Sequence, residues 1–147
     1  MAAKPKFIDF EVEQEPWNKY ELGDETILKT RYVLKTVTRS MVNGKNNYSG
    51  DGVPLMVIMV PGKLNGQPDN KKYSPKDLQA NIDKPDMKFR ISHEEWNEYR
   101  LDDGATIRMK STLTNISRTK LRDGHGDPIY NVNTNMMIQV KESNLDK

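Results

Sequence analysis

The sequence of 147 residues contains no cysteine and only two histidines. The absence of cysteine excludes disulfides, thiolate metal sites, iron–sulfur clusters and a cysteine nucleophile, and two isolated histidines do not predict a metal site. No apolar run approaches the roughly 20 residues that a membrane helix needs, and the segment MAAKPKFIDFEVEQ lacks the apolar stretch of a signal peptide. We therefore expect a soluble, cytoplasmic protein with no cofactor and no membrane partner.

Strongly apolar residues are also scarce. Leu, Ile, Val and Phe number 31 of 147, close to the fraction at which highly charged chains stay disordered. The net charge is only +2, however, because 23 Lys and Arg face 21 Asp and Glu. This composition favours a folded chain with a thin core, in one domain or two small ones, and excludes a large multidomain enzyme.

The chain resembles itself at an offset of 79 residues. Residues 10–40 align with residues 89–119 without a gap, and nine of the 31 pairs are identical, including both tryptophans of the protein. This pattern predicts a duplication, with a first β repeat over 7–60, a linker over 61–86, a second β repeat over 87–141 and a tail over 142–147. Units of about 55 residues bury little surface alone, so we expect the repeats to share one core.

Six large residues recur at matched positions and are predicted to anchor the repeats: Trp17, Tyr20 and Leu22 in the first, and Trp96, Tyr99 and Leu101 in the second. A repeated aromatic residue is more often a core anchor than a ligand platform. We therefore expect both tryptophans to be buried at equivalent places about a pseudo-twofold axis.

Local patterns favour an all-β fold. Apolar and polar residues alternate in 10–13 and 89–92, and Gly and Asp mark turns at 23–25 and 102–104. Long segments rich in β-branched residues follow, then Gly/Asn loops at 43–52 and 123–128, and final apolar strands. Within the linker, Ser74, Pro75 and Asp77 predict one short helix over about 75–82. We expect about ten antiparallel strands in a pseudo-symmetric barrel or sandwich.

The charges are segregated within each repeat. Residues 9–25 contain seven acids and one base, whereas residues 26–50 contain five bases and no acid, and the second repeat follows the same order. Because side chains two residues apart share one face of a strand, the sequence predicts two basic ladders. Their members are Lys29, Arg31, Lys35 and Arg39, and Arg108, Lys110 and Arg118.

Three interpretations of these ladders stay open. The bases can pair with acids across the hairpin, such as Glu21, Glu25 and Asp102. They can form a cationic surface that binds nucleic acid together with nearby aromatic residues. They can also support self-association, in which the acidic edge of one molecule meets the basic edge of the next.

No motif predicts catalysis. The sequence has no nucleophile elbow, P-loop or dinucleotide fingerprint, and the spacing of Asp123, His125 and Asp127 matches no established metal loop. The apolar run 55–60 is typical of a strand buried on both faces, either between layers or against another subunit. The sequence thus predicts no catalytic or metal-binding residue. It favours a non-enzymatic β-barrel binding or assembly module acting through protein–protein contacts or self-association, with a nucleic-acid-binding β domain as the alternative.

Overall fold

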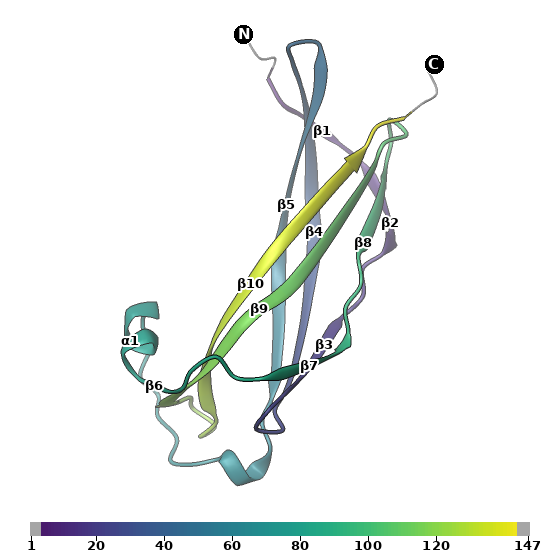
Figure 1. Cartoon of the computed structure of the whole chain (residues 1–147). Helices are drawn as coiled ribbons and strands as arrows, with labels where there is room; N and C mark the ends of the chain where they lie inside the picture. The colour runs from purple at the N-terminus through teal and green to yellow at the C-terminus, as the bar shows by residue number, and fades with distance from the viewer. Residues whose placement is uncertain (1–3, 144–147) are drawn as a thin grey trace.

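The computed structural model describes residues 4–143, and these residues consist mainly of antiparallel β-structure (Figure 1). The strands are β1 (Lys6–Ile8), β2 (Phe10–Gln14), β3 (Asn18–Leu22), β4 (Ile27–Val42), β5 (Lys45–Met59), β6 (Ile82–Lys84), β7 (Phe89–His93), β8 (Asn97–Leu101), β9 (Thr106–Arg122) and β10 (Pro128–Lys141). A 3-10 turn, η1 (Gly62–Leu64), and a short helix, α1 (Pro75–Ala80), lie between β5 and β6. The expected all-β class is confirmed.

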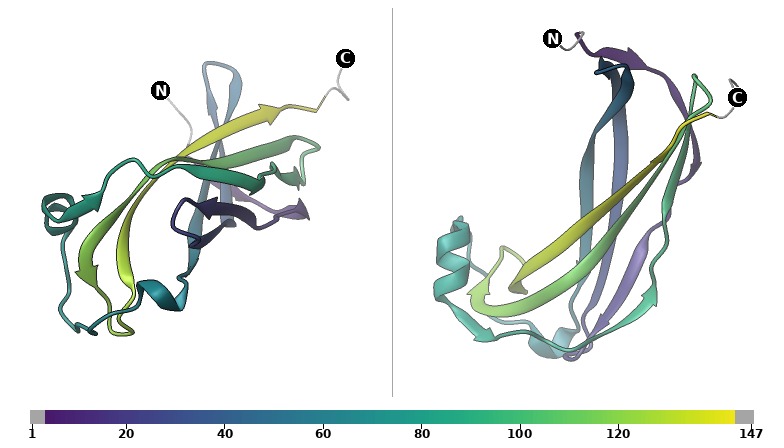
Figure 2. Two further views of the ribbon diagram at one scale, coloured as in Figure 1. Left: turned by 60° about the horizontal axis from the view of Figure 1, so that its bottom comes forward. Right: turned by 45° about the horizontal axis from the view of Figure 1, so that its top comes forward.

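The strands form two five-stranded antiparallel sheets. In sheet A, β4 pairs with β5 along one edge and with β1 and β3 along the other, and β7 follows β3. In sheet B, β9 pairs with β10 along one edge and with β6 and β8 along the other, and β2 follows β8. The hairpins β4–β5 and β9–β10 are long, and they cross each other in Figures 1 and 2. Because β5 and β10 each pair on one side only, the sheets do not close: the sandwich alternative is correct and the barrel alternative is wrong.

The two halves exchange a short strand. Strand β2 of the first half pairs with β8 of the second, and β7 of the second half pairs with β3 of the first. The registers correspond at the 79-residue offset, since Asn18 lies opposite Thr30 and Asn97 lies opposite Met109. Each sheet therefore contains a strand from the other half. This shared pattern is what a duplication would produce, and the ancestry itself stays a prediction.

Two small cores are present instead of a single one. One contains Leu34 and Val37 with Tyr99, Leu101, Ala105, Ile107 and Met109, and the other contains Tyr20, Leu22 and Leu28 with Leu113, Ile116 and Tyr130. Each core takes residues from both halves, so neither half can bury its apolar residues alone. The anchors Tyr20, Leu22, Tyr99 and Leu101 all lie in these cores.

A β-bulge interrupts each long hairpin at an equivalent place. The register shifts between Leu34 and Thr36 in β4, which leaves Lys35 as the extra residue, and the shift in the second hairpin leaves Thr114. An extra residue moves every later side chain to the opposite face of the strand. Lys29 and Arg31 therefore lie on one face while Arg39 lies on the other, so the prediction of one continuous ladder per repeat is wrong.

The loop predicted over 43–52 is a tight turn. Asn43 and Gly44 adopt positive φ angles of 51° and 78°, and β5 begins at Lys45. Gly52 lies within the strand, where a Cβ atom would clash with the carbonyl oxygen of Val33 and would come within 2.8 Å of the Tyr32 ring. This glycine allows a close approach of the backbone and the ring of β4, which explains why its presence does not indicate a loop.

The linker packs on the second half, and its Lys63 also forms an ion pair with Glu25 of the first half at 2.7 Å. Helix α1 begins as predicted, because the Ser74 hydroxyl accepts a hydrogen bond from the Asp77 amide at 3.2 Å and the Asp77 carboxylate accepts one from the Ser74 amide. It ends at Ala80, earlier than expected, because Ile82 begins β6. Gln79 contacts Asn131 on β10 at 3.1 Å, and Asn65 donates to the turn between β9 and β10. Of the predicted tail, 144–147 lie outside the described residues, and within 4–143 no helix is long and apolar enough to cross a membrane.

Candidate interaction surface

Two buried tyrosines bind carboxylates from the other half. The Tyr20 hydroxyl donates to Glu94 at 2.6 Å, and the Tyr99 hydroxyl donates to Glu15 at 2.8 Å. Burial and these hydrogen bonds raise the pKa of both tyrosines above the ordinary value. The pairs fix the crossing of the exchanged strands, and both carboxylates are engaged inside the fold.

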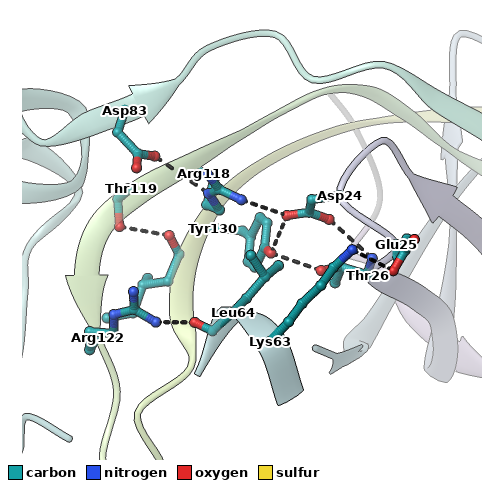
Figure 3. Close-up of polar contacts among 11 residues, drawn as sticks. Asp24, Glu25, Thr26, Lys63, Leu64, Asp83, Arg118, Thr119, Arg122 and Tyr130 are labelled. Atoms are coloured by element: carbon teal, nitrogen blue, oxygen red, sulfur yellow. Dashed lines mark hydrogen bonds and ion pairs between the residues drawn. The ribbon is translucent and has the colours of Figure 1, made fainter. Parts of the chain in front are cut away.

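Asp24 centres a second contact between the halves, drawn in Figure 3. Its carboxylate accepts hydrogen bonds from the Tyr130 hydroxyl at 2.7 Å, Arg118 at 3.3 Å and the Thr26 amide at 3.0 Å. Arg118 also lies 3.5 Å from Asp83. Burial alone would raise the pKa of Asp24, but these hydrogen bonds outweigh it and hold the pKa below its usual value.

Asp103 forms the equivalent contact at the other end. It accepts hydrogen bonds from Arg39 at 2.9 Å, the Tyr48 hydroxyl at 2.6 Å and the Ala105 amide at 2.9 Å. Burial and the hydrogen bond to Asp103 raise the pKa of Tyr48 to about 12. Arg39 and Arg118 thus hold the two halves together and are not free for an anionic partner.

The tryptophans are half-buried, and both lie at equivalent positions of the two halves. The cations of Lys29 and Arg31 lie 5.1 and 5.8 Å from the centre of the Trp17 ring. Around Trp96 the corresponding distances are 4.4 Å for Arg108 and 5.8 Å for Lys110. Tyr20 and Tyr99 fill the interior instead, and each tryptophan covers the stems of two cations on the adjoining long strand.

Most of the predicted ladder residues form ion pairs. Arg31 lies 3.5 Å from Glu15, Lys110 lies 3.8 Å from Glu94 and Arg108 lies 3.2 Å from Glu98. With Arg39 and Arg118, five of the seven bases have acidic partners. Two of the acids named above as examples of partners bind bases outside the ladders: Glu21 pairs with Arg90, and Glu25 pairs with Lys63. Lys29 and Lys35 have no ion pair among the residues that the structure describes.

Replacing Arg31 or Lys110 by glutamine is expected to lower the free energy of unfolding by about 1 kcal/mol, because each change leaves a largely buried carboxylate without its cation. Urea denaturation measures this loss. Lys35→Gln is the control and should change stability by less than about 0.5 kcal/mol. Unchanged stability in both variants would show that these ion pairs contribute nothing to the fold.

The outer face of sheet A carries an apolar strip. We define this face as the one with Lys29 and Arg31, opposite the buried Leu28, and the apolar strip as Ile27 and Val33 on β4 with Val53, Leu55, Val57 and Met59 on β5. The four residues on β5 are 39 to 46% exposed. The alternative that 55–60 is buried between layers of the chain is therefore wrong, because β5 is an edge strand that no layer formed by residues 4–143 covers, and burial against another subunit stays a prediction.

The equivalent face of sheet B is polar. Cross-strand pairs identify the equivalent positions, since Ile27 pairs with Met59 where Thr106 pairs with Lys141. The residues at the positions of Ile27, Val33, Val53, Leu55, Val57 and Met59 are Thr106, Thr112, Asn135, Met137, Gln139 and Lys141. Only Met137 is apolar among them. The same architecture therefore tolerates polar residues where sheet A has apolar ones.

The charges beside the strip differ in the same way. In sheet A, Lys19 lies directly opposite Lys29 on the neighbouring strand. In sheet B, the equivalent pair is Glu98 and Arg108, which form an ion pair at 3.2 Å. Neither Lys19 nor Lys29 has an acidic partner within residues 4–143. The outer face of sheet A thus combines apolar side chains with two cations that no carboxylate neutralises.

A cavity of about 220 Å³ lies where the two hairpins cross, and Thr30, Tyr32 and Met56 in its lining are on the face of sheet A opposite the strip. Its walls include Tyr32, Pro54, Leu55 and Met136. Within the described part of the chain, no group of three or more His, Asp or Glu residues could hold a metal ion. Comparisons with protein-family models, curated proteins and solved structures each returned no match.

Proposed function

We propose that the protein is a non-enzymatic binding module that docks a partner protein on the outer face of sheet A. The observation that carries this proposal is the contrast between the apolar strip and the polar residues at the same positions of sheet B. Isolated apolar residues on a surface need no explanation, but a contiguous strip is typical of a protein contact.

Site-specific photo-crosslinking tests the proposal. A photoreactive amino acid at Val57 should capture a defined partner in extracts of the source cells, whereas the same label at Gln139 should not. The captured protein is then purified and its binding to the full chain is measured. Equal capture from both positions, or a captured protein that does not bind once purified, would contradict the proposal.

Giving the strip the residues of sheet B should separate binding from stability. The triple variant Ile27→Thr, Val57→Gln and Met59→Lys is expected to bind the purified partner at least about tenfold more weakly, because it removes apolar contact area. Its free energy of unfolding should change by no more than about 0.5 kcal/mol per substitution. Gln139→Val on sheet B is the matched control and should leave binding unchanged.

Nucleic-acid binding is the second candidate. The half-buried Trp17 beside Lys29 and Lys19 supports it, because cations next to aromatic rings are typical of single-strand binding surfaces. Five of the seven ladder bases already face carboxylates, however, and the apolar strip offers nothing to phosphates. A protein partner therefore fits the surface better.

A further inference from the structure

Resting on the proposed function, we propose that the segment docked on sheet A is an acidic amphipathic helix of the partner protein. Its apolar stripe would cover the strip on β4 and β5. Carboxylates along one flank of the helix would face Lys19 and Lys29.

The charge requirement follows from the two lysines. Like charges directly opposite each other on neighbouring strands destabilise a sheet, and sheet B has an acid at the position of Lys19. His93 on β7 lies opposite Lys19. The Glu95 carboxylate lies 3.6 Å from His93 Nε2 and forms no ion pair with either lysine. The Trp17 ring holds the Lys29 ammonium over its face at 5.1 Å. A carboxylate placed between the lysines would replace one repulsion by two attractions.

The shape of the strip favours a helix over an added strand. The run from Val53 to Met59 covers seven residues of β5, or about 20 Å, which a helix of about 14 residues spans. Pro54 lies on this edge strand and has no amide hydrogen to donate, which opposes strand addition there. A helix with an apolar stripe flanked by acids matches an apolar column that runs beside two cations.

Two other occupants fit the charges less well. A second copy docked face to face would bring two more lysines into the same contact, and the acid on β3 of that face, Glu21, already pairs with Arg90. A nucleic acid would supply anions but would leave the apolar strip in contact with water or with charged phosphates. Charge and apolar surface together therefore select an acidic, apolar protein segment.

Three labelled peptides test this inference. Each has about 18 residues and the same leucine stripe, with Glu, Gln or Lys on its flank. Fluorescence anisotropy with the full chain should show at least about tenfold tighter binding of the Glu peptide than of the Gln peptide at low salt, and weaker binding still of the Lys peptide. Added salt should reduce the advantage of the Glu peptide, because salt screens exposed charges.

The variant Lys19→Glu gives the sharpest readout, because it installs in sheet A the acid–base pair that sheet B already has. We expect it to lose the preference for the Glu peptide while melting about 1–4 °C higher, because a repulsion becomes an ion pair. Lys120→Glu makes the same charge change on β9 of sheet B and should keep the preference. A Lys19→Glu variant that still prefers the Glu peptide overturns the inference.

The remaining outcomes separate this inference from the proposed function. If the Glu and Gln peptides bind equally well and the triple strip variant binds neither, the inference of an acidic partner is overturned but docking on the strip is supported. Binding of none of the three peptides overturns the inference, while crosslinking at Val57 still decides the proposed function. If a labelled single-stranded oligonucleotide binds the chain but does not bind the Lys19→Glu variant, both the inference and the proposed function are overturned in favour of nucleic-acid binding.

Discussion

Replacing Asp24 by alanine is expected to lower the free energy of unfolding by about 3 to 5 kcal/mol, as for other buried ion pairs that lose one partner. The Asp24 side chain is only 6% exposed and that of Arg118 only 14%. The change would leave the Arg118 guanidinium with Asp83 alone, and would leave the Tyr130 hydroxyl with only the Thr26 hydroxyl, at 2.8 Å, as its partner. Because these groups come from different halves, the loss acts on the contact between them. Urea denaturation of the variant and the parent chain measures it.

Asp103 provides the matched control for this prediction. It holds the equivalent Arg39 and Tyr48, but the Arg39 side chain is 42% exposed, so water can replace much of what the carboxylate supplies. Asp103→Ala should therefore cost only about 1.5 to 3 kcal/mol. If the two variants lose equal stability, burial is not what makes the Asp24 contact strong.

The fold was predictable where local patterns decide it. Alternation in the short strands, turn residues at Gly23 and Gly104, and the capping residues Ser74 and Asp77 all correspond to observed elements. The exchange of β2 and β7 was not predictable in this way. Which of two similar strands pairs with β8 depends on contacts between residues about 90 positions apart, such as Phe10 with Leu101. No local pattern records that choice.

The candidate surface was predicted only in part. The sequence singled out Lys29, Arg31 and the tryptophans, which the structure places together on the outer faces. It did not single out Lys19, because one base in a segment with seven acids would be expected to pair with one of them. Only the pairing of β3 with β4 shows that Lys19 lies opposite Lys29. It also assigned Val57 and Leu55 as buried, because a covered strand and an exposed edge strand can contain the same run of apolar residues. Aligning the final strands of the two repeats by cross-strand pairs, rather than by sequence, reveals the polar and apolar contrast.

The fold is expected to lose stability steeply above about pH 10, because three buried tyrosines must stay protonated in it. Burial is the main cause that raises the pKa of Tyr20, Tyr99 and Tyr130, and each hydroxyl also donates to a carboxylate, as Tyr130 does to Asp24. A raised folded-state pKa means that the stabilisation is complete below the unfolded-state pKa near 10 and is lost as the pH rises toward the folded-state pKa. Each group then contributes about 1.4 kcal/mol per pH unit, or about 4 kcal/mol per unit for the three together.

Urea denaturation at intervals between about pH 8 and pH 11 measures this slope, and the ultraviolet absorbance of tyrosinate reports when the hydroxyls ionise. Tyr99→Phe keeps the ring but removes one ionisable group, so its slope above pH 10 should fall by about a quarter, because Tyr48, whose pKa is raised to about 12, adds a fourth contribution. The variant loses the hydrogen bond to Glu15 at every pH. This loss lowers its free energy of unfolding at pH 8 but does not affect how steeply that free energy falls above pH 10. If Tyr99→Phe and the parent chain lose stability with the same slope, ionisation of the buried tyrosines is not what unfolds the protein.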